Sequence, residues 1–274
     1  MAGFRPRFFV SQSPVTRAGG VGLPPAEGAA GTRRPAGGHL EGVEVALSPE
    51  DSYHARRVLR LREGDLCEVV VGAAVYAASV VKATGVVTIR LDARLEGPEA
   101  GADYHFQVGL VQALSRPAVM DQVFEKGTEV GASFFVLVRA AGSPRGPGPP
   151  GRERLARWQR IAQEAAKQSK QVTVPSVTFA GSLDDALRVP RESGVLSLVL
   201  EPAASHTLSE ELQRQAPPAR LALWVGPEGG WTAAESERFS GLGIQAVRLG
   251  RSVLRTETAG PVGVAVARLA LGDW

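Results

Sequence analysis

The stretch Leu221–Glu235, LALWVGPEGGWTAAE, contains a strand, a turn and the start of a helix within fifteen residues. Its first five residues are all apolar, which is typical of a buried strand. Three glycines in Gly226-Pro-Glu-Gly-Gly230 let the backbone approach a ligand closely. Thr232 and Glu235 have the spacing of a capping box, which predicts a helix start. These residues alone leave two interpretations open, a ligand-binding loop and an ordinary tight turn.

A second glycine turn, Leu249–Pro261 (LGRSVLRTETAGP), also follows a short apolar segment. Arg255 and Glu257 place a cation and a carboxylate beside this turn, although an ion pair at a helix cap would have the same pattern. The small residues of 259–270 predict a helix whose backbone lies close to its neighbours, in a crowded core or at a subunit contact. Both turns are therefore candidate binding loops at the ends of strands.

Outward from these turns, residues 103–274 alternate between strand-like and helix-like segments. The predicted strands are 106–114, 134–138, 195–200, 221–225 and 246–249, and the clearest helices are 117–130 and 152–171. This alternation favours a parallel α/β sheet that binds ligands at the carboxyl ends of its strands.

The first hundred residues have a different pattern, with short strand-like pieces rich in Val, Tyr and Thr. These pieces are 7–10, 43–47, 67–71, 75–82 and 86–91, and they indicate a small antiparallel barrel or sandwich. Seven glycines and three prolines in 17–39 predict a flexible loop. Residues 97–101 are the natural linker, so we expect two domains, at 1–98 and 103–274.

Composition and motifs exclude several classes of protein. The 31 Lys and Arg residues against 28 Asp and Glu give a net charge of +3, which permits an anionic partner without requiring one. The single cysteine, Cys67, excludes a disulfide framework and fits a reducing cytosol. A GxGxxG pattern at 146–151 contains three prolines, which lack the N–H groups that would bind a pyrophosphate, so we interpret it as a loop. P-loop, HExxH and GxSxG motifs are absent from the sequence, and no targeting or membrane segment is found, so we expect a cytoplasmic protein without a metal site.

Basic residues gather in two segments. His54, Arg56, Arg57, Arg60 and Arg62 lie within nine residues without an acid among them, a pattern consistent with phosphate binding. Residues 152–171 hold six Lys and Arg against two Glu, a local excess larger than that of the whole chain. A charged face exposed to solvent is the alternative interpretation of this helix.

The motif pair Gly226–Gly230 and Leu249–Ala259 resembles the RsmE-type 16S ribosomal RNA uridine-N3 methyltransferases of the SPOUT superfamily. The resemblance extends upstream and covers most of the chain. Gln112–Arg116 with Glu125–Gly131 resembles the first strand and helix of that family, Arg157–Gln168 its second helix, and His54–Asp65 its N-terminal signature. Two segments depart from the family pattern, the long loop 17–39 and the Pro-Gly run 144–151. Both lie outside the matched motifs, so they bear on local RNA contacts and not on the class of reaction.

The resemblance implies an α/β fold with two specialised parts: a PUA-like RNA-binding β-barrel at 1–98, and a SPOUT domain at 103–274 that contains a deep trefoil knot. It also implies a homodimer that uses S-adenosylmethionine to methylate N3 of a uridine in 16S ribosomal RNA of the small subunit. The implied cofactor-binding residues are Leu200, Glu201, Gly226, Pro227, Glu228, Gly229, Gly230, Leu249, Gly250, Val253, Leu254 and Thr256. The implied RNA-binding residues are Arg7, His54, Arg57, Arg60, Arg62 and Arg116.

The implied catalytic residues are Arg255 and Glu257. Uracil N3 is protonated at neutral pH, so the enzyme has to remove that proton or stabilise the resulting anion. Arg255 would stabilise the uracil oxygens or hold a flanking phosphate, and Glu257 would orient Arg255, act as a base or only brace the loop. Glu201 would contact the ribose of the cofactor or have a structural role. Two alternatives remain, a SPOUT enzyme that methylates another RNA such as tRNA, and a non-catalytic RNA-binding assembly factor.

Overall fold

The computed structural model describes residues 5–10, 16–17, 40–72, 74–96, 104–144, 149–187 and 195–274. The predicted linker 97–101, most of the predicted loop 17–39 and part of the GxGxxG segment lie outside these ranges. The chain divides into two compact units, Met1–Ala102 and Asp103–Trp274. Among the described residues, no helix has the length and apolar character needed to cross a membrane.

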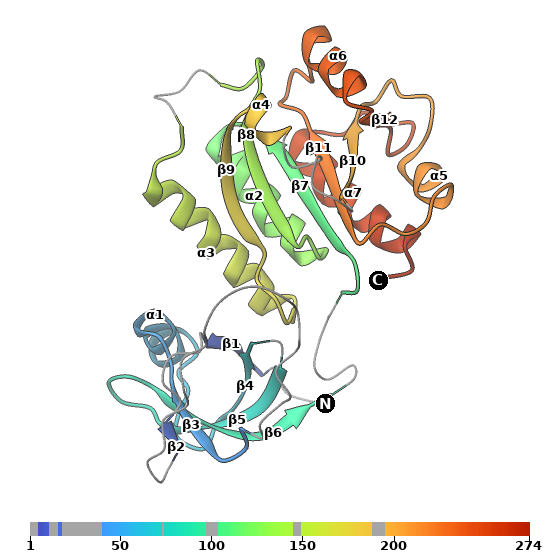
Figure 1. The fold of residues 1–274 in the computed structure, drawn as a ribbon. Helices are drawn as coiled ribbons and strands as arrows, with labels where there is room; N and C mark the ends of the chain where they lie inside the picture. Colours follow the sequence, from blue (N-terminus) through green and yellow to red (C-terminus); the bar gives the residue numbers. More distant parts are fainter. Residues whose placement is uncertain are drawn as a thin grey trace. The chain divides into compact units, whose positions relative to one another are not determined.

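The first unit is built on a six-stranded sheet with the strand order β1-β4-β5-β6-β3-β2 (Figure 1). Its strands are β1 (Arg7–Val10), β2 (Thr16–Arg17), β3 (Val43–Ala46), β4 (Leu66–Val71), β5 (Ala74–Lys82) and β6 (Thr88–Leu95). Alternate residues of β4, β5 and β6 are buried together, as the period of a strand requires. The expectation of an antiparallel sheet is wrong for one pair, because β1 runs parallel to β4. Arg7 lies opposite Glu68 in this register, and their side chains form an ion pair.

Between β3 and β4 the chain forms a short helix, α1 (Pro49–Tyr53), followed directly by one turn of π-helix, η1 (His54–Val58). Ser48 caps α1 by accepting a hydrogen bond from the Asp51 N–H at 3.0 Å. Ala55 is fully buried on the core side of η1. The basic residues at 54–62 therefore lie on a turn that is packed firmly against the sheet.

The second unit contains a six-stranded parallel sheet with the order β12-β10-β11-β7-β8-β9. Its strands are β7 (Gln107–Ala113), β8 (Phe134–Arg139), β9 (Ser176–Ser182), β10 (Val195–Leu200), β11 (Arg220–Val225) and β12 (Gln245–Val247). Its helices are α2 (Pro117–Glu129), α3 (Arg152–Gln168), α4 (Leu183–Ala186), α5 (Leu208–Gln213), α6 (Ala233–Gly241) and α7 (Thr256–Ala270). The predicted parallel α/β sheet is confirmed, whereas β9 and α4 were not predicted.

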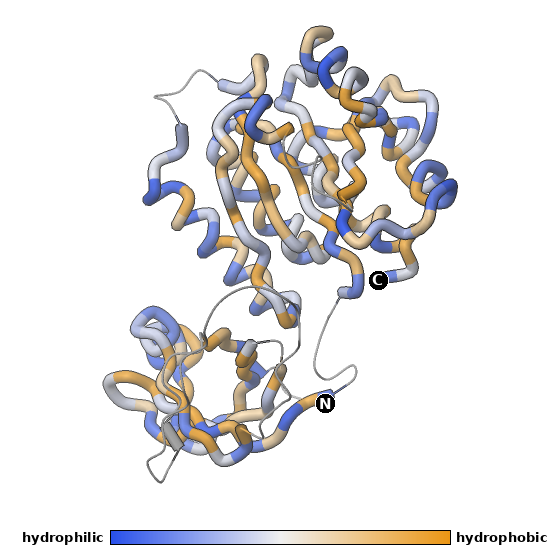
Figure 2. Tube along the Cα trace, in the orientation of Figure 1, coloured by the Kyte–Doolittle hydropathy of each residue, from blue (hydrophilic) through white to orange (hydrophobic). Residues whose placement is uncertain are grey.

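Helices cover both faces of this sheet, and residues of the central strands alternate between the two cores. Leu110, Leu221 and Leu223 pack with α2, α3, α5 and α7. Val111 and Trp224 pack on the opposite face with α4 and α6. The apolar residues of the central strands run through the middle of the unit in Figure 2. Burial on both faces explains why these strands read as continuous apolar runs in the sequence.

Glycines bring α7 unusually close to the sheet. A Cβ atom at Gly260 would lie 2.9 Å from Leu110 Cδ1, and one at Gly263 would lie 3.1 Å from Leu200 Cδ1 and 3.2 Å from Leu223 Cδ1. Any larger residue would push the helix away from β7, β10 and β11. The small residues of this helix therefore serve the core of the unit.

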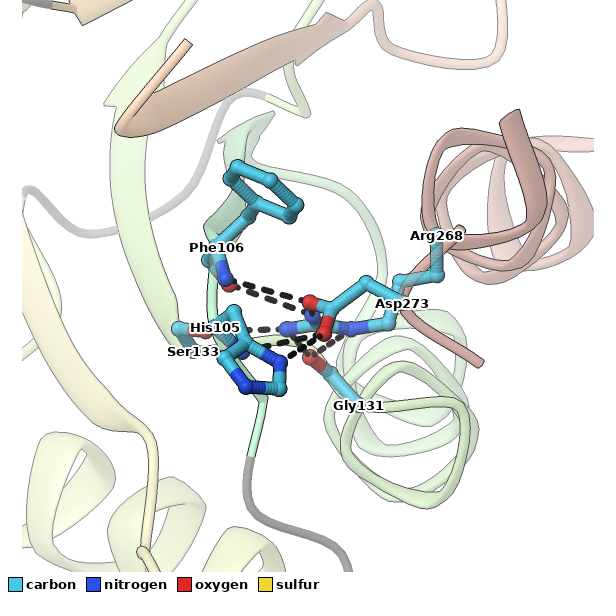
Figure 3. Close-up of polar contacts among 6 residues, drawn as sticks. All are labelled: His105, Phe106, Gly131, Ser133, Arg268 and Asp273. Atoms are coloured by element: carbon cyan, nitrogen blue, oxygen red, sulfur yellow. Dashed lines mark hydrogen bonds and ion pairs between the residues drawn. The ribbon is translucent and has the colours of Figure 1, made fainter. Parts of the chain in front are cut away.

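A buried polar cluster fastens the C-terminal end of the chain to the start of β7 (Figure 3). The Arg268 side chain is fully buried and donates to Asp273 Oδ2 at 2.6 Å, to the Phe106 carbonyl at 3.1 Å and twice to the Gly131 carbonyl. Asp273 in turn accepts hydrogen bonds from the N–H groups of His105 and Phe106. His105, the third residue of the second unit, is thus held in place.

Candidate active site

A cavity of about 630 Å³ lies at the carboxyl ends of β10, β11 and β12. Its size falls in the usual range for small-molecule sites, roughly 300–1,000 Å³. Three loops form most of its wall, and they begin at Glu201, Gly226 and Arg248, directly after the three strands. Parallel strands bring their carboxyl ends to one edge of a sheet, so loops that are far apart in the sequence meet here.

All residues that the resemblance implied in cofactor binding lie in the wall of this single cavity. They are Leu200, Glu201, Gly226, Pro227, Glu228, Gly229, Gly230, Leu249, Gly250, Val253, Leu254 and Thr256. Arg255, Glu257 and Arg116 line it as well. Two of the loops are joined directly, since Thr256 Oγ1 donates to the Gly226 carbonyl at 3.4 Å.

The glycines of the cavity wall differ in what the fold requires at each position, a positive φ or a lack of space for a Cβ. Gly230 has a φ of 73°, a conformation that residues with a Cβ rarely adopt. A Cβ at Gly226 would lie 3.2 Å from Trp231 Nε1. Gly229 and Gly250 have neither reason: their φ values are ordinary and nothing lies within 4 Å of an added Cβ. Folding therefore does not require glycine at these two positions, whereas a close approach of a ligand to the backbone would.

Glu228 is held at the edge of the cavity by residues that precede α2. Its carboxylate accepts hydrogen bonds from Arg116 Nε at 2.9 Å and from Ser115 Oγ at 3.1 Å. The hydrogen bond from the Arg116 guanidinium, helped by that from Ser115, keeps the pKa of Glu228 below its usual value. Arg116, an implied RNA contact, thus lies in the wall of the cavity and stabilises the glycine loop.

Arg255 and Glu257 have very different exposure. The Arg255 side chain is 88% exposed, the Glu257 side chain is 18% exposed, and the closest nitrogen and oxygen of the two are 4.0 Å apart. Arg255 is the N-cap residue of α7 and Glu257 lies in its first turn. An exposed cation and a partly buried carboxylate therefore meet at one side of the cavity, with only a long contact between them.

Glu235 stabilises the residues that follow the glycine loop through its hydrogen bonds. The predicted capping box is present: Glu235 accepts from the Thr232 N–H at 2.8 Å, and its own N–H donates to Thr232 Oγ1. Its other carboxylate oxygen accepts from the Ala141 N–H at 2.8 Å, which joins the loop after β8 to the start of α6. Burial alone would raise the pKa of Glu235, but these N–H donors hold it below its usual value. The bond to Ala141 crosses 94 residues, so local sequence spacing gave no signal for it.

Trp231 is a further wall residue that the sequence did not single out. Its ring packs edge-on against Phe239, with ring centroids 5.0 Å apart. Its indole Nε1 is buried and has no hydrogen-bond partner among the described residues. A buried donor without a partner is rare in a folded protein, so this N–H marks an unsatisfied polar group behind the cavity wall.

The implied RNA-binding residues of the first unit differ in accessibility. Arg57, Arg60 and Arg62 are exposed and His54 is half-buried. Arg7 is buried, and its guanidinium donates to Glu68 at 2.8 and 3.0 Å. This ion pair serves the β1–β4 contact, so the structure argues against Arg7 as an RNA contact. In the described ranges, no group of His, Cys, Asp and Glu residues is arranged to hold a metal ion.

Comparisons with known proteins agree with this geometry. The RNA methyltransferase domain family matches residues 102–268, which include the whole cavity. Ribosomal RNA small subunit methyltransferase E of Mycobacterium bovis is 30% identical over 85% of this chain and 89% of that protein. The protein of the same name from Synechocystis is 31% identical over 81% of this chain and 71% of its own length.

Solved structures extend the comparison. A Legionella pneumophila protein described as a methyltransferase in complex with its cofactor SAM is 29% identical, with a TM-score of 0.73 over 85% of this chain and 95% of that chain. A Neisseria gonorrhoeae ribosomal RNA small subunit methyltransferase E, 23% identical, shares the fold with a TM-score of 0.74 over 97% of this chain and 98% of that chain. Fold and cavity thus define an RNA methyltransferase. Within that class, the chain belongs to the ribosomal RNA small subunit methyltransferase E family.

Proposed function

We propose that this protein transfers the methyl group of S-adenosylmethionine to N3 of a specific uridine in the 16S ribosomal RNA of the small ribosomal subunit. The observation that carries the proposal is the convergence of the two glycine turns and the Arg255–Glu257 pair on one cavity. Small-subunit ribosomal RNA is the substrate named for the relatives, and a bound SAM is named for the Legionella structure.

The cavity fits a cofactor of this kind. The open space beside Gly229 and Gly250 leaves room for an adenosine-sized group to approach the backbone. Glu201 lies at the end of β10, where its carboxylate is available to the hydroxyl groups of a ribose. The binding residues we propose are those that line this wall.

S-adenosylmethionine, when bound, supplies an electrophilic methyl group for an in-line displacement. The protein then has to orient the uracil and hold N3 without its proton. We assign to the exposed Arg255 the stabilisation of the negative charge that develops on the uracil oxygens. We assign to Glu257 either the orientation of Arg255 or the acceptance of the N3 proton, a step that is worth roughly 10²–10⁴ in rate when a general base performs it.

The proposal also includes the finer architecture. The loops around the cavity would form a deep trefoil knot, as the resemblance to the SPOUT superfamily implies. The first unit, at residues 1–98, would act as a PUA-like RNA-binding barrel beside a SPOUT domain at 103–274. A homodimer would cover Leu269 and Trp274, two large apolar side chains that are 69% and 68% exposed. Light scattering of the purified protein tests the dimer.

Methyl transfer is tested with small subunits from a bacterial strain that lacks this methylation. The protein and radiolabelled S-adenosylmethionine are added, and the modified nucleoside is identified by mass spectrometry. We expect one N3-methyluridine per 16S RNA, no transfer to tRNA, and binding of the cofactor in calorimetry. Label in tRNA would refute the substrate, and absence of cofactor binding would refute the enzymatic function.

The Glu257→Gln variant separates the two roles of Glu257. It keeps the shape of the side chain and the ability to orient Arg255 through its amide oxygen, but it cannot accept a proton at neutral pH. A base role predicts loss of transfer with unchanged cofactor binding. Turnover near that of wild type would instead assign Glu257 to orientation.

A further inference from the structure

The ends of the helices in this protein show an unusual pattern. Helices α2, α6 and α7 each end in a glycine with a positive φ, at Gly131, Gly243 and Gly272. The turn η1 and helix α3 end in the same way but with Arg60 (φ 55°) and Lys170 (φ 59°). In the part of the chain that the structure describes, these are the only residues other than glycine with a positive φ.

Arg60 is not needed for the turn in which it lies. Two backbone hydrogen bonds close this turn, from Leu59 N–H to the His54 carbonyl at 3.0 Å and from Leu61 N–H to the Ala55 carbonyl at 2.9 Å. Glycine would adopt the left-handed conformation without strain, whereas a residue with a Cβ is strained there. Favourable interaction with the helix end is already supplied by Arg56 and Arg57. The strain at Arg60 therefore points to a use of its side chain at the surface.

The surface around Arg60 combines positive charge with an exposed aromatic ring. The side chains of Tyr53 and Val58 are 61% and 60% exposed. Tyr53 is the N-cap residue of η1 and Val58 is its last residue. The two lie five residues apart, the spacing of hydrogen bonds in a π-helix, so they lie near one face of the turn, with Arg57 between them in the sequence. The sequence from Tyr53 to Arg62 contains four arginines and no acid. An exposed aromatic ring with four arginines within the next nine residues is the pattern of a surface that binds single-stranded nucleic acid.

Buried contacts hold the backbone on both sides of Tyr53. Ser52 is buried, donates to the Leu47 carbonyl at 3.3 Å and accepts from the Val87 N–H at 3.0 Å. Ala55 is fully buried against the sheet. Because its two neighbours are held in this way, we expect that a base stacking on Tyr53 would not have to order the turn first.

We propose that Tyr53, Arg57 and Arg60 bind unpaired nucleotides of the RNA substrate, with the Tyr53 ring stacked on a base and the two guanidinium groups on flanking phosphates. The inference rests on the proposed function in one respect, that the substrate is RNA. An aromatic ring can stack on a base only where that base is not paired within a duplex, which makes the partner single-stranded RNA. Arginine suits the flanking positions because its planar fork matches a phosphate.

The test uses the full-length protein and fluorescence anisotropy with a labelled single-stranded 12-nucleotide oligouridine and a duplex RNA of equal length. Tyr53→Phe keeps the stacking ring and should bind the single strand like wild type. Tyr53→Ala should weaken binding of the single strand about tenfold, within the range measured for loss of one stacked base, and should leave duplex binding unchanged. Equal affinities of the alanine and phenylalanine variants for the single strand would overturn the role of Tyr53.

The Arg60→Gly variant should change stability and RNA affinity in opposite directions. The variant should raise the melting temperature, because it relieves the strained φ, and yet bind the single strand more weakly, with a slope of log K against log salt that is smaller by about one. Arg94→Gln, which removes an exposed charge of the same unit outside residues 53–62, is the matched control and should change neither property. An Arg60→Gly variant with unchanged affinity and salt slope would overturn the role of Arg60.

Methyl transfer to small subunits is measured on the same preparations, so that the two failures can be told apart. If wild type methylates the small subunit while Tyr53→Ala and Arg60→Gly bind the oligonucleotide normally, this inference alone fails. If wild type transfers no methyl group but its oligonucleotide binding depends on Tyr53 and Arg60, the proposed function fails and the binding surface stands. Wild-type protein that binds neither RNA probe overturns the inference.

Discussion

Replacement of Asp273 by alanine is expected to destabilise the second unit by about 3–5 kcal/mol, the usual cost of breaking a buried ion pair from one side. The Arg268 side chain is 0% exposed and that of Asp273 is 4% exposed, with 2.6 Å between their charged atoms. The variant leaves a buried guanidinium without its counter-charge. It also removes the acceptor for the N–H groups of His105 and Phe106.

The magnitude follows from what remains bonded in the variant. Arg268 keeps the carbonyls of Gly131 and Phe106 and the hydroxyl of Ser133, all neutral acceptors. These retained bonds limit the loss, and water entering the space of the missing carboxylate would satisfy the two N–H groups. We therefore expect the cost of one broken pair, and not that cost plus the roughly 1–3 kcal/mol for each orphaned N–H.

Urea denaturation followed by tryptophan fluorescence measures this loss, because all four tryptophans of the chain lie in the second unit. The matched control is Asp184→Ala, which breaks an ion pair of the same unit with Arg238 at 2.5 Å. Its two side chains are 49% and 63% exposed, and such pairs are worth about 0–1 kcal/mol. If Asp273→Ala costs no more than Asp184→Ala, burial does not set the strength of the Arg268–Asp273 pair and the reasoning is refuted.

Three further predictions concern pH, the cavity and the single thiol. Burial would raise the pKa of Asp273, but N–H donors and Arg268 hold it below its usual value. The contribution of Asp273 to stability is therefore complete above the unfolded pKa of about 3.9 and is lost as the pH falls through the lower folded pKa. The free energy of unfolding of Asp273→Asn should accordingly depend less on pH between 2 and 5 than that of wild type. Gly229→Leu should leave the melting temperature unchanged but lower the affinity for S-adenosylmethionine at least tenfold in calorimetry. The reason is that the new side chain would occupy open space in the cavity wall. Normal binding would show that the cofactor does not approach the backbone at this position. Burial raises the pKa of Cys67 to about 12, so the thiol should react with Ellman's reagent at pH 8 only after unfolding. Rapid reaction of the native protein would contradict the burial of this side chain.

The position of the cavity could be predicted from the sequence because it depends on a general property of parallel sheets. Each glycine turn follows an apolar strand, and the carboxyl ends of such strands share one edge. The capping box of Thr232 and Glu235 could be predicted for the same kind of reason, since its partners are three residues apart. Where a feature depends on a fixed local spacing or on sheet geometry, the sequence was sufficient.

Features that depend on distant partners were not predictable in this way. None of the residues of the edge strand β9 is fully buried, and polar and apolar residues alternate only over Ser176–Phe179, so its signal in the sequence is weak. Arg7 reads as a surface cation until Glu68, 61 residues further along the chain, is placed beside it by the parallel pairing of β1 and β4. The strained φ of Arg60 leaves no trace in the sequence at all, because the residue expected at that position is glycine.

The positions most informative about function are those where the residue differs from what folding alone would select. Gly131 satisfies a local demand, since its φ of 90° requires a residue without a Cβ. Gly229 and Arg60 do the opposite: one is a glycine that the backbone does not require, and the other is an arginine where the backbone favours glycine. Each departure makes sense if a ligand supplies the missing reason, a cofactor close to the backbone at Gly229 and a phosphate at Arg60. The two variants Gly229→Leu and Arg60→Gly therefore test one principle from both sides, because each should preserve or raise stability while it weakens the binding of a different ligand.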